Sequence, residues 1–220
     1  MQALDHNAYL ALREGAQVLE ADRFGDKVLR LSNGNFLKLF RRKRLLSSAA
    51  LLSYAQRFAD NARALQQHQI PCPQVIAVYK LRSIQRDAVY YAPLEGQTLR
   101  QLFDNPELAA ALRAQLGEFV AQLHARGVYF RSLHLGNIVL TPANTLGLID
   151  IADLKCHRRA LSLNKRLRNF QHMLRYSQER QWLLEDKSSD FLQSYLSSSC
   201  LKMNLSDLQQ RLMNTHKASR

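Results

Sequence analysis

Asn137 and Asp150 are the residues whose types and spacing best suit chemistry in this 220-residue chain. Each lies in an apolar run, Gly136-Asn-Ile-Val-Leu and Leu146-Gly-Leu-Ile-Asp, and a Thr-Pro-Ala-Asn turn joins the two. The pattern predicts a buried hairpin with both polar side chains at its open end, where they need a polar partner. A Mg²⁺ ion held on nucleotide phosphates would satisfy both. The alternative is structural: an Asn that caps a turn and an Asp that orders a loop.

Ser132 stands where a general base is expected. In the motif H-R-D-x-x-x-x-N the catalytic Asp precedes the Asn by five residues, and this position is Ser132. A serine cannot take up the proton of an attacking hydroxyl as a carboxylate does. His134 and Asp153 are the nearby alternatives, although bracing of the loop is the favoured role for His134. Phosphoryl transfer depends mostly on positioning and charge neutralisation, so loss of the base does not by itself exclude activity.

Residues 18–40 are predicted to form three antiparallel strands that position a lysine. The segment Ser32-Asn-Gly-Asn favours a tight hairpin turn, because Asn-Gly tolerates positive φ. In the third strand Lys38 alternates with apolar residues, and from there it can reach the α- and β-phosphates of ATP. Most strand lysines are merely solvated, so the value of Lys38 comes from its place in the order of elements. Gly25 is the single glycine where a phosphate-binding loop is expected, which is weak support because any tight turn could use it.

A helix is predicted from Leu45 to His68 by apolar residues at i, i+3 and i+4 spacing. In active kinases a Glu on this helix pairs with the strand lysine. Here Asn61 stands at that position, and Asp60 is one residue away, about 100° around the helix. The sequence therefore predicts that the ion pair is missing or is supplied from elsewhere.

The remaining elements complete an α+β fold with two lobes. Two further strands, 75–80 and 87–91, precede the connector Ala92-Pro-Leu-Glu-Gly-Gln-Thr, the best candidate for a boundary. Beyond it we expect a helix that begins at Pro106 and ends before Gly127, and two or three amphipathic helices between 161 and 213. We predict a small antiparallel β lobe with one helix (1–92, nucleotide binding) and a mainly helical lobe (93–220).

The net charge of +13 and a pI near 10.1 point to a polyanionic partner. Two basic clusters stand out, Arg41-Arg-Lys-Arg44 and a set after Asp150 (Lys155, His157, Arg158, Arg159, Lys165, Arg166, Arg168). Few aromatic residues interleave with them, which disfavours single-stranded nucleic acid. A solvated basic surface is the structural alternative. Three scattered cysteines are typical of reduced thiols in a cytosolic protein, and we expect no signal peptide or membrane span.

From about Val18 to Tyr176 the chain resembles the bacterial lipopolysaccharide core kinases, the Kdo and heptose kinase group of the protein-kinase-like superfamily. The most specific matches are Leu133-His-Leu-Gly-Asn-Ile-Val-Leu, Leu148-Ile-Asp and Asn164-Lys-Arg-Leu-Arg-Asn-Phe. The resemblance implies a two-lobed kinase-like fold that binds ATP and Mg²⁺. It implies that Lys38 contacts the ATP phosphates and that Tyr91 and Ala92 bind adenine through the hinge backbone. Asn137 and Asp150 would hold the metal.

The resemblance also implies an anionic glycolipid or phosphorylated sugar as acceptor. The protein would then be cytoplasmic, in peripheral contact with the inner face of the inner membrane. The family's catalytic Asp maps to Ser132 and its helix Glu to Asn61. Three functions stay open: an ATP-dependent phosphotransferase of envelope glycolipids, a pseudokinase that binds nucleotide or a partner enzyme, and a basic protein that binds nucleic acid or membrane.

Overall fold

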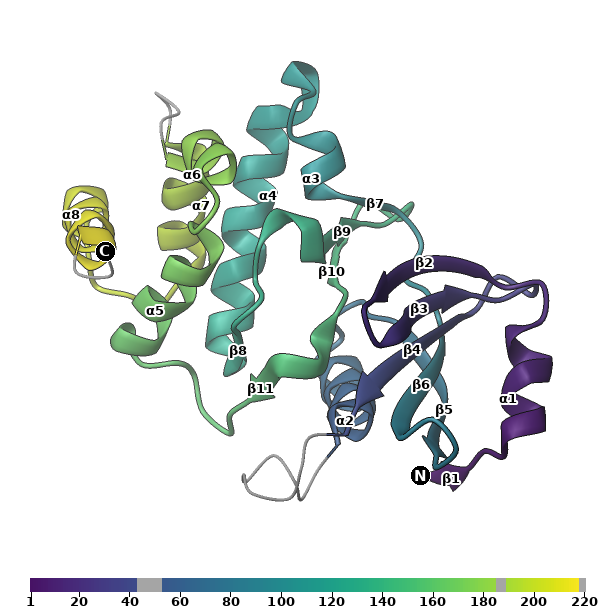
Figure 1. The fold of residues 1–220 in the computed structure, drawn as a ribbon. Helices are drawn as coiled ribbons and strands as arrows, with labels where there is room; N and C mark the ends of the chain where they lie inside the picture. The colour runs from purple at the N-terminus through teal and green to yellow at the C-terminus, as the bar shows by residue number, and fades with distance from the viewer. Residues whose placement is uncertain (43–52, 185–188, 218–220) are drawn as a thin grey trace. The chain divides into compact units, whose positions relative to one another are not determined.

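The computed structural model describes residues 1–42, 53–184 and 189–217 (Figure 1). These residues form an α+β fold with a small sheet lobe and a helical lobe, which confirms the predicted class. The chain divides into two compact units, one of Met1–Leu94 with Ile151–Asp153 and the other of Glu95–Asp150 with Leu154–Arg220. None of the described helices is long and apolar enough to cross a membrane.

The first unit contains a six-stranded sheet. Its order is β1 (Gln2–Ala3), β5 (Gln74–Leu81), β6 (Arg86–Ala92), β4 (Phe36–Arg41), β3 (Gly25–Arg30) and β2 (Gln17–Asp22). All neighbours are antiparallel except β1, which runs parallel to β5. The five strands predicted between residues 18 and 91 are therefore present. The sequence-based prediction missed β1 and the first helix, α1 (His6–Arg13).

Each face of this sheet packs against a different helix. Tyr9 of α1 joins the apolar cluster on one face, together with Leu37 and Leu39 of β4. Strand side chains alternate between the faces, so Lys38 lies on the opposite face. On that face the ring of Phe58, from α2 (Tyr54–Gln67), lies 5.1 Å from the ring of Tyr91.

Helix α2 begins after Ser53, whose side chain accepts a hydrogen bond from the Gln56 N–H. It ends at Gln67, close to the predicted end at His68. The predicted start at Leu45 lies outside the described residues, as does the second half of the basic run Arg41–Arg44.

The second unit combines helices with two small sheets. Its helices are α3 (Leu99–Leu102), α4 (Pro106–Ala125), α5 (Leu163–Met173), α6 (Ser177–Leu184), α7 (Asp190–Ser198) and α8 (Leu205–Lys217). The sheets are β10 (Leu146–Leu148), β9 (Ile138–Leu140) and β7 (Gln97–Thr98), and the pair β11 (Leu154–Cys156) and β8 (Val128–Phe130). Helix α4 begins at Pro106 and its cap is followed by Gly127 with φ of 77°, as predicted. Beyond residue 160 the described residues form four helices, so the expected two or three was wrong.

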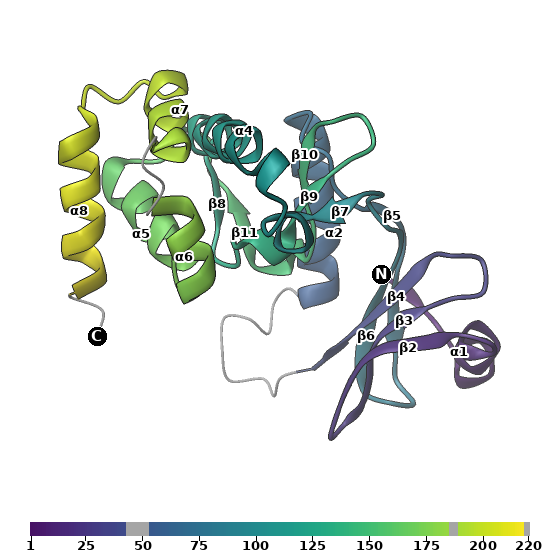
Figure 2. The same cartoon turned by 90° about the horizontal axis from the view of Figure 1, so that it is seen from above.

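Helix α4 forms the centre of this unit and runs alongside α7 (Figure 2). The two helices approach closely at Gly117, where a Cβ atom would lie 2.3 Å from the Phe191 carbonyl oxygen. Only a residue without a side chain allows this distance.

A fully buried polar chain centred on His124 links α4, α5 and α7. Arg166 Nη1 donates to the Tyr195 hydroxyl oxygen (3.2 Å), which leaves the hydroxyl proton to be donated to His124 Nδ1 (2.9 Å). His124 Nε2 then donates to Asn169 Oδ1 (3.2 Å), and Asn169 Nδ2 donates to the Phe130 carbonyl oxygen (2.6 Å). Each donor in this series of hydrogen bonds has an acceptor, and the last bond holds the backbone at the end of β8 in place. Arg166 was expected in a basic surface cluster, but it is buried here because its guanidinium is used internally.

Candidate active site

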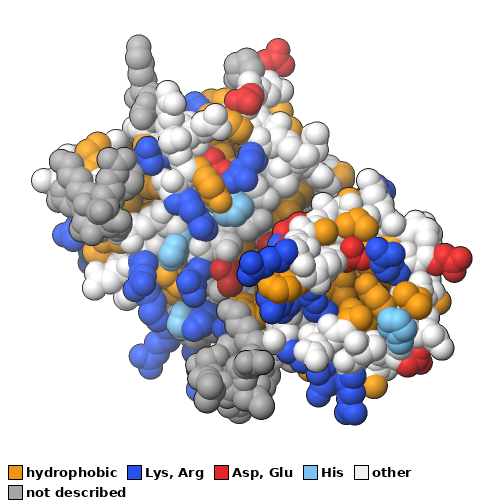
Figure 3. All heavy atoms as spheres, in the orientation of Figure 1, with side chains coloured by type: hydrophobic (Ala, Val, Ile, Leu, Met, Phe, Trp, Pro, Cys, Tyr) orange, Lys and Arg blue, Asp and Glu red, His pale blue; other side chains and the backbone are white. Residues whose placement is uncertain are grey.

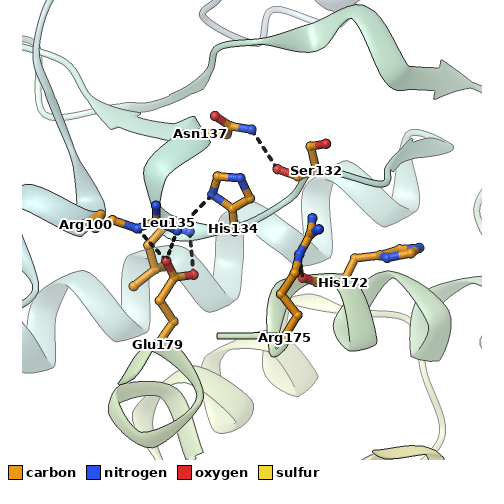
Figure 4. Close-up of polar contacts among 8 residues, drawn as sticks. All are labelled: Arg100, Ser132, His134, Leu135, Asn137, His172, Arg175 and Glu179. Atoms are coloured by element: carbon orange, nitrogen blue, oxygen red, sulfur yellow. Dashed lines mark hydrogen bonds and ion pairs between the residues drawn. The ribbon is translucent and has the colours of Figure 1, made fainter. Parts of the chain in front are cut away.

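The loop between β8 and β9 carries Ser132, His134 and Asn137. Asn137 is buried, and its Nδ2 donates a hydrogen bond to the backbone carbonyl oxygen of Ser132 at 3.0 Å (Figure 4). This bond uses Nδ2 as a donor and leaves Oδ1 as the acceptor of the amide. The hairpin of β9 and β10 forms as predicted, with Leu146 paired to Leu140 and Leu148 to Ile138.

Asp150 follows the second strand of this hairpin. The backbone N–H of Ile149 donates to the Asn137 carbonyl oxygen at 3.0 Å. Asp150 therefore lies at the same end of the β9–β10 hairpin as Asn137. Asp150 is exposed and has a backbone φ of 52°. This value lies in the left-handed region, which residues other than glycine rarely adopt. Backbone strain of this kind is concentrated at functional sites.

His134 lies in the same loop, where Arg100 Nη2 is 3.3 Å from its Nδ1. A guanidinium can only donate, so Nδ1 accepts, and the neutral ring must carry its proton on Nε2. Burial, and then the charge of Arg100, lower the pKa of His134, which keeps the ring neutral at pH 7. Figure 4 shows the ring between Arg100 and the Ser132–Asn137 pair. In this state the free edge of His134 is a hydrogen-bond donor and not a proton acceptor.

Glu179 of α6 holds both the loop and Arg100. The residue is 2% exposed, and its Oε2 accepts the Leu135 backbone N–H at 3.0 Å. Its Oε1 accepts from Arg100 Nε at 2.8 Å and also from Arg100 Nη2 (Figure 4). A buried carboxylate requires such partners. Gly136 allows Arg100 to lie this close, because a Cβ there would lie 3.0 Å from the guanidinium.

The residues predicted to bind nucleotide lie in the first unit. Lys38 is half-buried at the centre of β4, paired in register with Val28 on β3 and Val89 on β6. Tyr91 and Ala92 end β6. Tyr91 is 8% exposed and its ring packs against Phe58, so a ligand would meet this position through backbone groups.

Gly25 begins β3, directly after a two-residue turn of Arg23 and Phe24. Its φ of 108° requires glycine, and nothing lies within 4 Å of the position of a Cβ. The exposed ring of Phe24 lies under the guanidinium of Arg41, 3.6 Å from the ring centroid, and Arg23 is at 4.7 Å. The turn between β2 and β3 thus carries one glycine, Gly25, and two arginines, Arg23 and Arg41, lie around its Phe24 ring.

Asn61 contacts the segment that follows Asp150. Its Nδ2 donates to the Ile151 carbonyl oxygen at 2.7 Å, within the first unit. Asp60 bonds to Gln56 and Arg63 of its own helix. A Glu in place of Asn61 could not donate this hydrogen bond.

Asn137 and Asp150 offer oxygen atoms of the kind that Mg²⁺ prefers as ligands. Mg²⁺ is typically bound through one or two carboxylates, with phosphate oxygens and water completing the octahedron. The Oδ1 of Asn137 and the carboxylate of Asp150 are oxygen donors of this kind. No group of three or more His, Cys, Asp and Glu side chains that could hold a metal occurs in the part of the chain that the structure describes. Phosphate oxygens would therefore have to supply part of the coordination.

Residues 18–131 match the sequence profile of the phosphotransferase enzyme family known as APH, which is more than half of the chain. The chain belongs to the APH phosphotransferase family. This membership places it in the protein-kinase-like superfamily, in agreement with the two-lobed α+β fold. The APH match ends one residue before Ser132, so the loop geometry is an independent observation. A comparison with curated proteins gives no match.

The structure brings Ser132, His134, Asn137 and Asp150 together in the second unit and places Gly25, Lys38, Tyr91 and Ala92 in the first. Sequence reasoning missed Arg100, Glu179, Arg175 and Tyr176, which surround the loop. No motif marks them, since Arg100 and Glu179 are 79 positions apart.

Proposed function

We propose that the protein is an ATP- and Mg²⁺-dependent phosphotransferase that acts on a lipopolysaccharide core sugar or a related anionic envelope glycolipid. The observation that carries the proposal is the orientation of Asn137. Its amide nitrogen donates to the Ser132 backbone, which leaves its side-chain oxygen as an acceptor. The hydrogen bond from the Ile149 N–H to the Asn137 carbonyl oxygen brings Asp150, with its positive φ, to the same end of the hairpin.

The roles of the other residues follow from their chemistry. Lys38 supplies a positive charge for the ATP phosphates, and the backbone at Tyr91 and Ala92 offers hydrogen bonds for the adenine. A bound Mg²⁺ ion would neutralise developing charge on the phosphates. In the transfer, the acceptor hydroxyl oxygen forms a bond to the γ-phosphorus as the bond to the ADP oxygen breaks.

The proton of the acceptor hydroxyl must leave during this step. Ser132 cannot take it up as a carboxylate can, and Arg100 occupies the acceptor nitrogen of His134. Release to water or to a phosphate oxygen is compatible with a loose transition state, which needs little base assistance. The protein's contribution is then mainly positioning and charge.

The acceptor class is inferred from charge. A net charge of +13 favours an anionic substrate, and an envelope glycolipid would draw the protein to the cytoplasmic face of the inner membrane. The resemblance of the loop and of residues 164–170 to lipopolysaccharide core kinases supports the same class.

A pseudokinase that binds nucleotide without turnover is the second candidate. Ser132 together with the donor state of His134 favours it, because neither side chain accepts a proton at neutral pH. Ser132→Asp separates the two functions. A large rise in ATP turnover would identify the wild type as a pseudokinase or a crippled enzyme, whereas substantial wild-type turnover that Asp150→Ala abolishes identifies an enzyme.

Nucleotide binding is the first test. ATP with Mg²⁺ should raise the melting temperature, because a ligand that binds only the folded state stabilises it. Asp150→Ala should lose the Mg²⁺-dependent part of the rise. Asp104→Ala, which removes an exposed carboxylate elsewhere in the same unit, should keep it. No shift for the wild type at millimolar ATP and Mg²⁺ would refute the proposal.

A further inference from the structure

Two arginines and a tyrosine lie beside the Ser132–Asn137 loop without a part in the proposed phosphate chemistry. Tyr176, just before α6, is 43% exposed. The guanidinium carbons of Arg100 and Arg175 lie 4.8 and 5.5 Å from the centroid of its ring. The His134 ring meets Tyr176 edge-on, with centroids 5.4 Å apart. These four side chains, Arg100, His134, Arg175 and Tyr176, form an arginine–tyrosine cluster.

Both guanidinium groups are held in place and still have donors to offer. Arg100 is anchored through Nε and Nη2 by Glu179 and His134. Arg175 donates from Nε to the His172 carbonyl oxygen and from Nη2 to the Arg131 carbonyl oxygen, each at 3.2 Å. Among the hydrogen bonds of the described residues, none uses Nη1 of either arginine. Anchored guanidinium groups of this kind lose little entropy when they bind a carboxylate or phosphate.

An open hollow of about 300 Å³ adjoins the cluster, lined by Arg100, Phe103, Tyr176, Ser177, Gln178 and Glu179. Its volume is in the range of small-molecule sites. Glu179 is the one acidic side chain of this lining, and it is already paired with Arg100. In Figure 3 basic side chains gather around hydrophobic and His side chains on this unit. The surroundings therefore favour an anion and repel a cation.

We propose that the arginine–tyrosine cluster binds the acceptor of the phosphotransferase through a phosphate or carboxylate group carried on a sugar. Arg100 and Arg175 bind the anionic group, and the exposed Tyr176 ring contacts the sugar. Because Glu179 bonds to both Arg100 and the Leu135 N–H, the acceptor would be positioned relative to the loop that holds Asn137. This inference rests on the proposed function and names the residues that select its substrate class.

The cluster also differs from the basic surfaces that the sequence singled out. Arg168 belongs to the expected cluster after Asp150 and is exposed on α5 of the same unit. If overall charge alone attracted the acceptor, loss of Arg168 would matter as much as loss of Arg175. The proposal predicts that it does not.

The test measures binding of glucose 6-phosphate and glucuronic acid by isothermal titration, with glucose and glucosamine as the neutral and cationic counterparts. Wild-type protein should bind the two anionic sugars at least tenfold more tightly than glucose, and glucosamine more weakly still. Arg175→Gln should weaken binding of the anionic sugars at least tenfold, since a hydrogen bond to a charged group is among the stronger ones. Arg100→Lys keeps the charge beside Glu179 but loses the planar fork, and should also weaken binding. Arg168→Gln is the matched control and should change affinity less than twofold.

Three results would overturn the assignment: equal affinity for glucose and glucose 6-phosphate, equal losses in Arg168→Gln and Arg175→Gln, or inorganic phosphate binding as tightly as the sugar phosphate. Melting with ATP and Mg²⁺ is recorded on the same variants. If ATP and Mg²⁺ raise the melting temperature but the anionic sugars bind no more tightly than glucose, this inference alone is refuted. If ATP and Mg²⁺ leave the melting temperature of the wild type unchanged, the proposed function is refuted.

Discussion

Acidification should destabilise the helical lobe through His124. This side chain is fully buried, and burial followed by the nearby charge of Arg166 lowers its pKa from 6.5 to about 3. In the unfolded chain the pKa returns to about 6.5. Between these values the unfolded state binds a proton that the folded state does not, so stability is fully present above pH 6.5 and falls as the pH drops toward 3.

The size of the effect follows from the two pKa values. Each unit of pH across the window in which only the unfolded chain is protonated contributes about 1.4 kcal/mol. From pH 7 to pH 5 the free energy of unfolding should therefore fall by about 2 kcal/mol on account of His124 alone. This is a large share of the stability of an ordinary domain.

Urea unfolding monitored by tryptophan fluorescence measures this directly. The chain has a single tryptophan, Trp182 on α6, in the same unit as His124. His124→Gln should be less stable at pH 7, because it disturbs the bonds to Tyr195 and Asn169, yet it should lack the acid-dependent loss. The other histidines are present in both proteins, so their contributions cancel in the comparison. Equal losses from pH 7 to pH 5 in the wild type and the variant would refute the reasoning.

Three further outcomes are expected. Glu179→Gln removes the buried charge that pairs with Arg100 and should cost roughly 1–3 kcal/mol of unfolding free energy; a change below about 0.5 kcal/mol in urea unfolding would contradict this. Asp150→Gly should be about 1 kcal/mol more stable than Asp150→Ala, because only glycine adopts a φ of 52° without strain. A higher melting temperature for Asp150→Ala than for Asp150→Gly would contradict backbone strain at this position. Gly117→Ala should destabilise by about 1–3 kcal/mol despite the better helix propensity of alanine, because its Cβ would lie 2.3 Å from a backbone oxygen of α7; a rise in melting temperature would exclude this close approach.

Much of the fold could be predicted because its signals are local. Alternation of apolar residues around Lys38, the Asn-Gly turn and the Pro106–Gly127 limits each reflect the conformation of a few neighbouring residues. The elements that were missed have weak local signals. Strand β1 has two residues and depends on pairing with β5, and α1 is short with an apolar contact carried mainly by Tyr9.

The residues of the candidate site also divide into those with a local sequence signal and those without one. Asn137 and Asp150 could be identified because a motif spaces them along a hairpin. Glu179 and Arg100 could not, since they meet only when α3 and α6 pack around the loop. Arg166 was misread for a related reason: a charged residue in a basic run looks solvent-exposed until its internal acceptors are known.

The bond from Asn137 to residue 132 has a consequence for substitutions at that position. It uses the main-chain oxygen, which every amino acid provides, so this bond does not depend on the side chain at that position. Replacing a carboxylate with serine here would therefore leave this bond intact, and so would the reverse change. Loss or gain of a proton acceptor at position 132 is separable from the hydrogen bond that orients Asn137.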